Sequence, residues 1–515
     1  MRNVRGGGGP RSGGAARGGG TGRSGAPKAT PGPAGAPVER PARRSRPPAT
    51  ARGVALEVVR AVARDDAYAN LLLPVAIRRA RLSPADSGLA TELAYGTLRR
   101  RGLYDAIIVE ASGRGTDRID ADALDVLRLG AHQLLRMRVP AHAAVGETVE
   151  LSRAIGAHRA TGFINAVLRR IAQRSEQEWT DALLADETDP DARLAIATAH
   201  PVWVVAALRS ALEREGRGDE LPVLLAADNV SPRVTLVALP GLASIPPELE
   251  GSRTHHSPLG YLSPSGDPAA DPEVAAGRVR VQDEGSQLAA LALSRARPVT
   301  AGERWLDLCA GPGGKAALLA AEAIAGGATL VANEVVPARA ELVRKALAPL
   351  GDGIEVRTGD GRTIDATDAE GFDRILLDAP CTGLGALRRR PEARWRKTEG
   401  DVPSLAALQT ELLESAIGAL RPGGLLAYVT CSPHPAETTE VVDRALASDA
   451  ATTAGIRRAD TGAALASIVR EPLDLGDLDG AAQLWPHRHG GDAMFIQLLE
   501  RPAPDAGPAL DTLRA

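Results

Sequence analysis

Cysteine, aromatic residues and long apolar runs are all scarce in this sequence. Three of the 515 residues are cysteine, and 3% are aromatic. Cys309, Cys381 and Cys431 lie far apart, with no Cys-x-x-Cys pair and no Cys/His cluster nearby. This spacing argues against a zinc site and against a secreted disulfide framework, and it leaves thiol chemistry open.

Membrane-spanning and secretion signals are also missing. No run reaches about 18 apolar residues, and the amino terminus lacks the charged-then-apolar pattern of a signal peptide. We therefore expect a cytoplasmic protein with no membrane partner. With 44% hydrophobic residues, the chain is long enough for two to four packed domains.

The first segment, residues 1–52, differs from the rest in composition. It holds eleven of the 61 Lys and Arg residues but one of the 64 acidic residues, Glu39, and it is rich in Gly and Pro. Almost nothing in it is large and apolar, so we expect a disordered basic tail. Two interpretations stay open, namely phosphate contacts with RNA and a plain solvated extension.

Residues 53–175 show helical periodicity. Ala55, Val58, Val59 and Val62 recur on one face of the first segment, and similar amphipathic stretches follow at 89–111, 120–137, 144–156 and 161–174. The sequence predicts an all-α domain. In residues 190–280 a turn and two short alternating stretches, 233–239 and 278–281, instead predict a small α/β unit.

Residues 281–500 alternate strand-like and helix-like segments, followed by a tail at 501–515. The predicted strands are RWLDL (304–308), TLVAN (329–333), IEVRTG (354–359), FDRILLDAP (372–380), LLAYVTCS (425–432) and MFIQLL (494–499). This rhythm predicts an α/β fold with a doubly wound, mostly parallel sheet. Ligands of such sheets bind beyond the carboxyl ends of the strands.

A glycine-rich turn follows the first of these strands. It comprises Cys309, Ala310, Gly311, Pro312, Gly313, Gly314 and Lys315, and it opens a helix. Glycines allow close approach of a ligand, and a helix amino terminus favours an anionic group. Glu334 ends the second strand, where it could accept ribose hydroxyls, and Asp360 ends the third, near an adenine. Together they suggest a nucleoside with a short charged tail, and S-adenosylmethionine is the obvious candidate.

The other two cysteines follow the fourth and fifth predicted strands. If these strands are neighbours, their backbones lie about 4.8 Å apart, so Cys381 and Cys431 face one cleft. Two thiols suggest covalent work: a thiolate adds to carbon 6 of cytosine, carbon 5 then takes a methyl group, and a second group assists release. Asp378 could hydrogen-bond the pyrimidine, Lys315 could assist, and Pro380 fixes the turn.

Longer motifs resemble a known family. CAGPGGK, LLDAPCTGLGALRRRPEARW, LRPGGLLAYVTCSPHPAE and LWPHRHGGDAMFIQLLER are similar to the RNA cytosine-5 methyltransferases. Upstream, ATELAYGTLRR, VPAHAAVGETVELSRAIG and GFINAVLRRI resemble the NusB-like RNA-binding domain that precedes the catalytic domain in bacterial ribosomal RNA members. The resemblance implies a Rossmann-like S-adenosylmethionine-dependent domain, small-subunit (16S) ribosomal RNA as partner and a monomeric enzyme.

The resemblance also assigns roles. It implies that Cys431 is the nucleophile, that Cys381 assists product release, and that residues 309–315, Glu334, Asp360 and Asp378 contact the cofactor. It further implies that the 190–280 unit contacts RNA, although a connecting module suits its residues almost as well. Three departures from the family pattern are Gly311 in place of alanine, Thr438 in place of asparagine, and GGDAMF in place of Asp-Gly-Phe-Phe.

Two features near the cysteines have competing interpretations. Basic residues follow the Pro-Cys turn and either grip RNA phosphates, with Trp395 stacking on a base, or form a solvated loop: Arg388, Arg389, Arg390, Arg394 and Arg396. His434 either lowers the pKa of Cys431 or is structural. A disulfide between the two cysteines is not expected as a resting state in a reducing cytoplasm.

Two other functions compete with RNA methylation. A DNA cytosine methyltransferase is expected to use the Pro-Cys thiol as nucleophile and to carry a following Glu-Asn-Val, which this sequence lacks. A noncatalytic RNA-binding or assembly factor would not need both thiols, Asp378 and Lys315. The sequence therefore favours the RNA enzyme.

Overall fold

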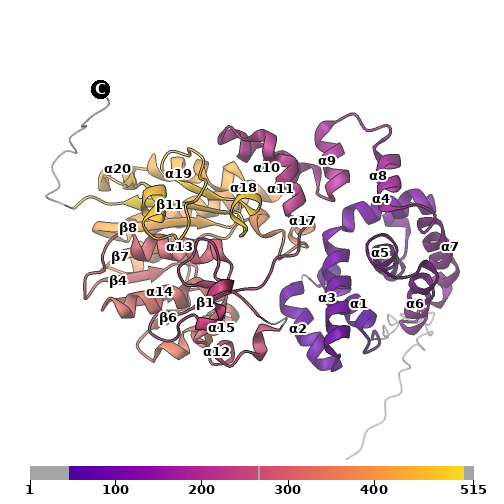
Figure 1. Ribbon diagram of the computed structural model, residues 1–515. Helices are drawn as coiled ribbons and strands as arrows, with labels where there is room; N and C mark the ends of the chain where they lie inside the picture. The colour runs from indigo at the N-terminus through magenta and orange to yellow at the C-terminus, as the bar shows by residue number, and fades with distance from the viewer. Residues whose placement is uncertain (1–45, 66, 265–266, 504–515) are drawn as a thin grey trace, which may run out of the picture. The chain divides into compact units, whose positions relative to one another are not determined.

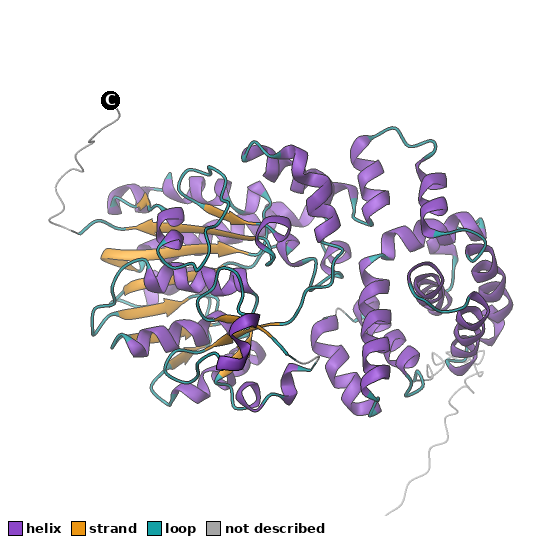
Figure 2. Cartoon of the chain, viewed as in Figure 1, coloured by secondary structure: helices purple, strands orange, loops and turns teal. Residues whose placement is uncertain are grey.

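The computed structural model describes residues 46–65, 67–264 and 267–503 (Figure 1). Most of the predicted basic tail and of the 501–515 tail lies outside these residues. The described chain contains a run of helices, a small sheet and a larger sheet covered by helices (Figure 2).

The amino-terminal helices form the predicted all-α part. They are α1 (Ala51–Arg64), α2 (Ala69–Ala80), α3 (Pro84–Arg99), α4 (Arg101–Ser112), α5 (Ala121–Arg136), α6 (Ala141–Ala154), α7 (Thr161–Ile171) and α8 (Glu176–Leu184). The Thr50 hydroxyl caps α1 and the Ser83 hydroxyl caps α3, where Pro84 takes the first turn without losing a bonded N–H. The sequence did not predict α2, and the predicted helix at 89–111 is interrupted at Arg100.

One apolar core unites these helices. It includes Leu93, Leu127 and Leu168 from α3, α5 and α7, and it continues to Trp179 of α8, whose indole N–H donates to the Ile171 carbonyl at 3.0 Å. The packed helical core thus extends a few residues beyond the predicted end at 175.

The middle of the chain combines helices with a three-stranded sheet. Its elements are α9 (Pro190–Thr198), α10 (Val202–Arg214), α11 (Leu221–Ala227), β1 (Thr235–Ala238), β2 (Gly260–Leu262), α12 (Pro272–Ala275) and β3 (Val279–Val281). The sheet is antiparallel in the order β2-β1-β3, and β2 was not predicted. Helices α10 and α11 share an apolar core with Leu384, Leu387 and Trp485 of the last domain, so this unit packs directly on that domain.

The last part is the predicted doubly wound domain. Its strands are β4 (Arg304–Asp307), β5 (Thr329–Asn333), β6 (Glu355–Arg357), β7 (Phe372–Asp378), β8 (Leu420–Thr430), β9 (Arg457–Arg458), β10 (Ala482–Leu484) and β11 (Met494–Glu500). The order is β10-β11-β8-β7-β4-β5-β6; β8, β7, β4, β5 and β6 run parallel, and β11 and β10 run antiparallel at one edge. All six predicted strands are present.

Helices cover both faces of this sheet (Figure 2). The helices of the domain are α13 (Glu284–Arg295), α14 (Gly314–Ala325), α15 (Pro337–Leu347), α16 (Ile364–Thr367), α17 (Ala393–Arg396), α18 (Val402–Gly418), α19 (Thr439–Leu446), α20 (Asp449–Ala454), α21 (Thr461–Ala466) and α22 (Pro486–His489). One core joins α13, α14 and α15 to the sheet, and a second joins α18 and α19 to the opposite face. The fold class predicted from the sequence is confirmed.

No single helix within the described residues has the length and apolar character needed to cross a membrane. Helices α9 and α10 meet that test only when taken together, and they are bent by 110° at their break.

Candidate active site

The predicted site residues gather at the carboxyl ends of three adjacent parallel strands. In the order β8-β7-β4, these strands end directly before Cys431, Asp378–Cys381 and the glycine-rich turn that starts at Cys309. The chain passes from β4 to β5 on one side and later returns to β7 on the other side of β4. The strand order therefore reverses at β4, and ligands of such sheets bind at the carboxyl ends of the strands beside this point.

The two thiols lie against each other. Cys381 Sγ and Cys431 Sγ are 3.5 Å apart, although 50 residues separate them in the sequence, and both cysteines are free and partly exposed. A disulfide would need a separation of about 2.05 Å. The neighbouring strands predicted from the sequence therefore do bring both sulfurs to one place.

A half-buried ion pair lies beside the thiols. Lys315 Nζ lies 2.8 Å from Asp378 Oδ2, so the glycine-rich turn is bound to the end of β7. Burial lowers the pKa of Lys315, but the charge and hydrogen bond of Asp378, together with Cys431 and Asp307, outweigh it and leave the pKa above its ordinary value. The amine therefore stays charged next to the sulfurs.

The environment makes the two thiols unequal. The hydrogen bond from Cys381 is the largest cause that lowers the pKa of Cys431, and the charges of Lys315 and Arg390 add to it against burial. The same bond is the largest cause that raises the pKa of Cys381 well above its ordinary value. Of the two thiols, Cys431 is therefore the one whose surroundings favour the thiolate form.

The glycine-rich turn is held by Glu334. Its carboxylate accepts from the Gly311 N–H at 3.1 Å and from the Val336 N–H at 2.9 Å. A Cβ at Gly311 would stand 2.2 Å from Glu334 Oε2, and Gly313, with φ +103°, would meet the Ala346 side chain at 2.5 Å. The turn therefore needs both glycines to approach the end of β5 and the side of α15.

Asp307, at the end of β4, was not singled out from the sequence. It is fully buried, burial raises its pKa to about 8, and neither carboxylate oxygen has a hydrogen-bond partner of good geometry in the described chain. An acid of this kind beside a glycine turn suits a ligand with a cationic amine. The signal in the sequence was its place at the strand end, two residues before the turn.

The remaining predicted cofactor residues lie nearby with varied surroundings. Ala310 N–H donates to the Asn333 carbonyl at 2.8 Å, and Gly313 is the residue that precedes α14. Burial raises the pKa of Cys309 well above its ordinary value, so this thiol stays protonated. Asp360 is exposed and bound to Arg362 by hydrogen bonds from its N–H and guanidinium.

One arginine of the basic segment after the Pro-Cys turn is unavailable to phosphates. Arg394 is 0% exposed, and its guanidinium donates to the carbonyls of Arg99, Ala199 and Asp228 and to Asn229 Oδ1. The hypothesis of an RNA contact is wrong for Arg394, and so is the alternative of a solvated loop.

Most of the neighbouring side chains in this segment are bound as well. Arg388 donates to the Gly490 carbonyl, Arg389 pairs with Asp492, and Arg396 donates to the Ala67 carbonyl. Trp395 packs against Gly102 of α4, where a Cβ would meet the ring at 2.3 Å. Neighbouring protein groups thus occupy the side chains that the sequence assigned to RNA. The reason is tertiary packing, which sequence composition does not reveal.

The loop after Cys431 is stabilised locally. His434 Nδ1 accepts from the Ala436 N–H at 3.1 Å, and burial lowers its pKa, so the ring is neutral and structural. Thr438, which replaces asparagine, donates to the carbonyls of His434 and Pro435 at 3.0 and 3.3 Å. The threonine therefore still supports the loop.

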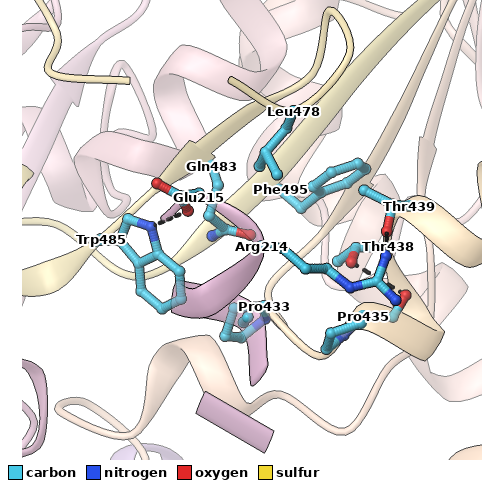
Figure 3. A pocket seen from close by; sticks show the side chains of 11 residues that line it. Arg214, Glu215, Pro433, Pro435, Thr438, Thr439, Leu478, Gln483, Trp485 and Phe495 are labelled. Carbon is cyan, nitrogen blue, oxygen red and sulfur yellow. Dashed lines mark hydrogen bonds between the residues drawn. The ribbon is translucent and has the colours of Figure 1, made fainter. Parts of the chain in front are cut away.

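A separate hollow borders the outer side of this loop (Figure 3). Arg214 at the end of α10 donates to the Thr439 hydroxyl at 3.0 Å, and the Trp485 indole donates to Glu215 at 2.6 Å. Its lining contains none of the predicted site residues, and these polar groups are already paired. We therefore assign the chemistry to the thiol cluster and not to this hollow.

Comparisons with known proteins agree with this fold and site. A family model described as "16S rRNA methyltransferase RsmB/F" matches residues 297–500, and one described as "NusB family" matches residues 49–173. "Putative methyltransferase Rv1407" from Mycobacterium tuberculosis is 46% identical over 463 residues, which span 89% of this chain and 98% of that protein.

More distant relatives extend the agreement. "Ribosomal RNA small subunit methyltransferase B" from Pseudomonas putida is 36% identical over 434 residues, 78% of this chain and 92% of that protein. The solved structure of PH0851 is similar with a TM-score of 0.72 over 89% of this chain and 100% of that one; at 22% identity it shows the fold.

These matches confirm S-adenosylmethionine as the cofactor predicted from the sequence. The residues present fit it, because a Cβ at Gly314 would meet no atom within 4 Å, which leaves the backbone there open to a ligand, and the Asp307 carboxylate suits the cationic amino group of its methionine part. The length and identity shared with the curated relatives settle the family: the chain belongs to the RsmB/F family of methyltransferases, with a NusB-family helical domain before the catalytic one.

Proposed function

We propose that the protein methylates carbon 5 of a cytosine in small-subunit (16S) ribosomal RNA through a covalent adduct with Cys431. The observation that carries this proposal is the pair of thiols 3.5 Å apart with opposite pKa shifts. The names of relatives such as "Ribosomal RNA small subunit methyltransferase B" support the choice of RNA.

The first step uses the thiolate. Cys431 Sγ adds to carbon 6 of the ring, and the electron pair of the carbon 5–carbon 6 double bond makes carbon 5 nucleophilic. S-adenosylmethionine supplies the methyl group that carbon 5 takes. Asp378 is placed to hydrogen-bond the pyrimidine, and the charged Lys315 beside it stabilises the negative charge that develops on the ring.

Release needs the second thiol. Cys381, once it has lost its own proton to solvent, takes the proton from carbon 5; the electron pair of that bond restores the double bond, and Cys431 leaves carbon 6 as a thiolate. While Cys431 is a thiolate, its hydrogen bond is the largest cause of the raised pKa of Cys381. Once Cys431 is bound to carbon 6 that cause is gone, so Cys381 becomes easier to deprotonate at the moment when release requires it.

The other predicted residues complete the assignment. We propose that Asp378, Glu334, Asp360 and the residues of the glycine-rich turn contact the cofactor: Cys309, Ala310, Gly311, Pro312, Gly313, Gly314 and Lys315. The placement of the turn and of both acids at the carboxyl ends of β4, β5 and β6 supports this.

The domains receive matching roles. We propose that residues 53–175 bind RNA and that residues 190–280 mainly connect, which the shared core of α10 and α11 with the catalytic domain supports. We also propose that the enzyme acts as a monomer. A cytoplasmic location fits two thiols that must stay reduced.

A denaturing gel tests the chemistry. Wild type, Cys381→Ala and Cys431→Ala are each incubated with unmodified small-subunit ribosomal RNA and S-adenosylmethionine. We expect a persistent covalent protein–RNA band with Cys381→Ala and none with wild type or Cys431→Ala. A band with Cys431→Ala instead would reverse the two roles.

A DNA substrate distinguishes an RNA methyltransferase from a DNA methyltransferase. DNA with the same sequence as the RNA should give neither a covalent band nor a methylated product. Methylation of the DNA would favour the DNA enzyme, and absence of product from every substrate would favour a noncatalytic binding factor.

A further inference from the structure

A buried carboxylate lies between the two cysteine loops. Glu437 is 0% exposed and belongs to the turn that follows Cys431. Its Oε1 accepts from the Thr382 N–H at 2.8 Å and from Gln409 Nε2 at 3.2 Å, and its Oε2 accepts from the Thr382 hydroxyl and from the Ser432 hydroxyl at 2.6 Å. Glu437 has no role in the proposed methyl-transfer steps.

Its partners are the residues next to the sulfurs. Thr382 directly follows Cys381, Ser432 directly follows Cys431, and their hydroxyl oxygens lie 3.1 Å apart. A bond to each of these residues fixes the backbone that carries the neighbouring sulfur. One carboxylate thereby controls how far apart the two thiols stand.

A third element secures the same arrangement. Gln409 of α18 donates both to Glu437 and to the Pro380 carbonyl at 2.8 Å, one residue before Cys381. Tyr428 of β8 donates to the backbone carbonyl of Glu437 at 2.7 Å. The acid is therefore held from the helix and from the strand, and it cannot shift without moving both loops.

The charge of Glu437 also affects the pKa of Cys381. The four donors leave Glu437 only the role of acceptor, which suits an ionised carboxylate. The bond with Cys431 is the largest cause of the raised pKa of Cys381, burial follows, and the charge of Glu437 adds to them. The other charged groups that act on Cys431 are Asp378, Lys315 and Arg390.

We propose that Glu437 is the positioning residue that holds the two cysteine loops in register, so that the Cys381 and Cys431 sulfurs stay 3.5 Å apart. We call the set of hydrogen bonds from Glu437 to the two cysteine loops the tether. Its effect on turnover rests on the proposed cytosine methylation, but the tether itself does not. The acid acts through Thr382 and Ser432 and need not touch the substrate.

Alkylation of the thiols tests the tether without RNA. Glu437→Gln keeps the shape, but it removes the negative charge and replaces one acceptor oxygen with an amide nitrogen. The two hydroxyls that donate to Oε2 must then reverse their hydrogen bonds or lose them. We expect the pH midpoint for iodoacetamide labelling of Cys431, read by peptide mass spectrometry, to rise by about one unit. Glu437→Asp should recover part of the shift. Glu440→Gln, which removes a more exposed acid paired with Arg214 on the same segment, should match wild type.

Kinetics then measure the consequence. With small-subunit ribosomal RNA and S-adenosylmethionine, Glu437→Gln should lower kcat at least about tenfold while both KM values stay within about threefold, since the substrates are bound elsewhere. A labelling midpoint equal to that of wild type would overturn the proposal, and so would an unchanged kcat in an enzyme that methylates RNA.

Two further variants, each lacking one hydrogen bond to Glu437, test the proposal if Glu437→Gln does not fold. Ser432→Ala and Thr382→Val each remove one hydroxyl bond to the acid and should each raise the labelling midpoint; midpoints equal to wild type in both would refute the tether. If wild type itself fails to methylate any cytosine, the proposed function fails, whereas the labelling series still decides whether Glu437 positions the thiols.

Discussion

The loops that carry the two cysteines are supported from different places. The loop after Cys431 is bound within its own domain, by Gln409, Tyr428 and its own Glu437. The segment after Cys381 instead leads to residues 384–396, which bond and pack against the helical domain. The Cys431 loop thus rests on support within its own domain, whereas the Cys381 loop and the segment after it have contacts with the helical domain in addition to local bonds with Glu437 and Gln409.

Because of this difference, attack on the base and product release should respond differently to changes in the helical domain. Glu392 accepts from the Ala69 N–H at the start of α2, and Arg99 donates to the Arg388 carbonyl. Any shift of α2 or of the junction between α3 and α4 therefore reaches the segment behind Cys381 first. We expect perturbations of the helical domain to slow product release more than attack.

The largest expected effect comes from Arg394→Met. It removes a guanidinium that satisfies three buried carbonyls and Asn229, so the free energy of unfolding should fall by about 3–5 kcal/mol. Thermal unfolding measures the loss. In the folded fraction, RNA adducts should persist longer than in wild type.

Lys397→Met is the control for Arg394→Met. Lys397 lies three residues after Arg394, and its positively charged side chain is half-exposed. Equal unfolding temperatures for the two variants would mean that the Arg394 contacts do not join the domains in solution.

Gly385→Ala should disturb both cysteine loops at once, because the two loops meet at this residue. Gly385 N–H donates to the Cys431 carbonyl at 2.8 Å, and a Cβ here would stand 2.0 Å from the Ala493 carbonyl oxygen. Overpacking against backbone should cost about 2–3 kcal/mol and lower methyl transfer at least about tenfold. Denaturant unfolding and a methyl-transfer assay measure both effects.

Gly400→Ala provides the comparison, since a methyl group there meets only the Thr398 hydroxyl at 3.7 Å. If both alanines were equally tolerated, the close approach of the two loops would be relaxed in solution.

A smaller effect is expected for the pH dependence of Cys431 in Cys381→Ala. The lost S–H donor is the largest cause that lowers the pKa of Cys431, so this pKa should rise. A higher pKa means less thiolate at neutral pH, and iodoacetamide labelling of Cys431 should slow at pH 7 and change little at pH 10. Unchanged labelling at pH 7 would show that Lys315 and Arg390 suffice.

The smallest effect is expected for His434→Ala. The ring caps a short turn and is neutral, so its loss should cost about 0.5–1 kcal/mol of stability and leave the labelling midpoint of Cys431 in place. A midpoint that moves would revive the interpretation in which His434 activates the thiol.

The strands and the thiol pair could be predicted because their signals are local. Each strand is an apolar run, a turn follows it, and neighbouring parallel strands end at one edge, which is enough to bring Cys381 and Cys431 together. Strand β2 has three residues, and α2 contains Pro74, so neither pattern indicates its structure.

The burial of charged residues could not be predicted. Arg394 looks like its exposed neighbours in sequence, yet its partners lie 165 to 295 residues away. Asp307 and Glu437 likewise show their importance only once the fold removes them from water. In each case the deciding quantity is a long-range contact, which periodicity and composition do not contain.

The closeness of the two sulfurs has a practical side. Two thiols 3.5 Å apart, one of them a thiolate, form a bidentate soft ligand. A trivalent arsenical that binds dithiols should therefore capture this pair in preference to the protonated, isolated Cys309. The arrangement that we propose for covalent methylation would also give the enzyme a selective chemical handle for labelling or inhibition.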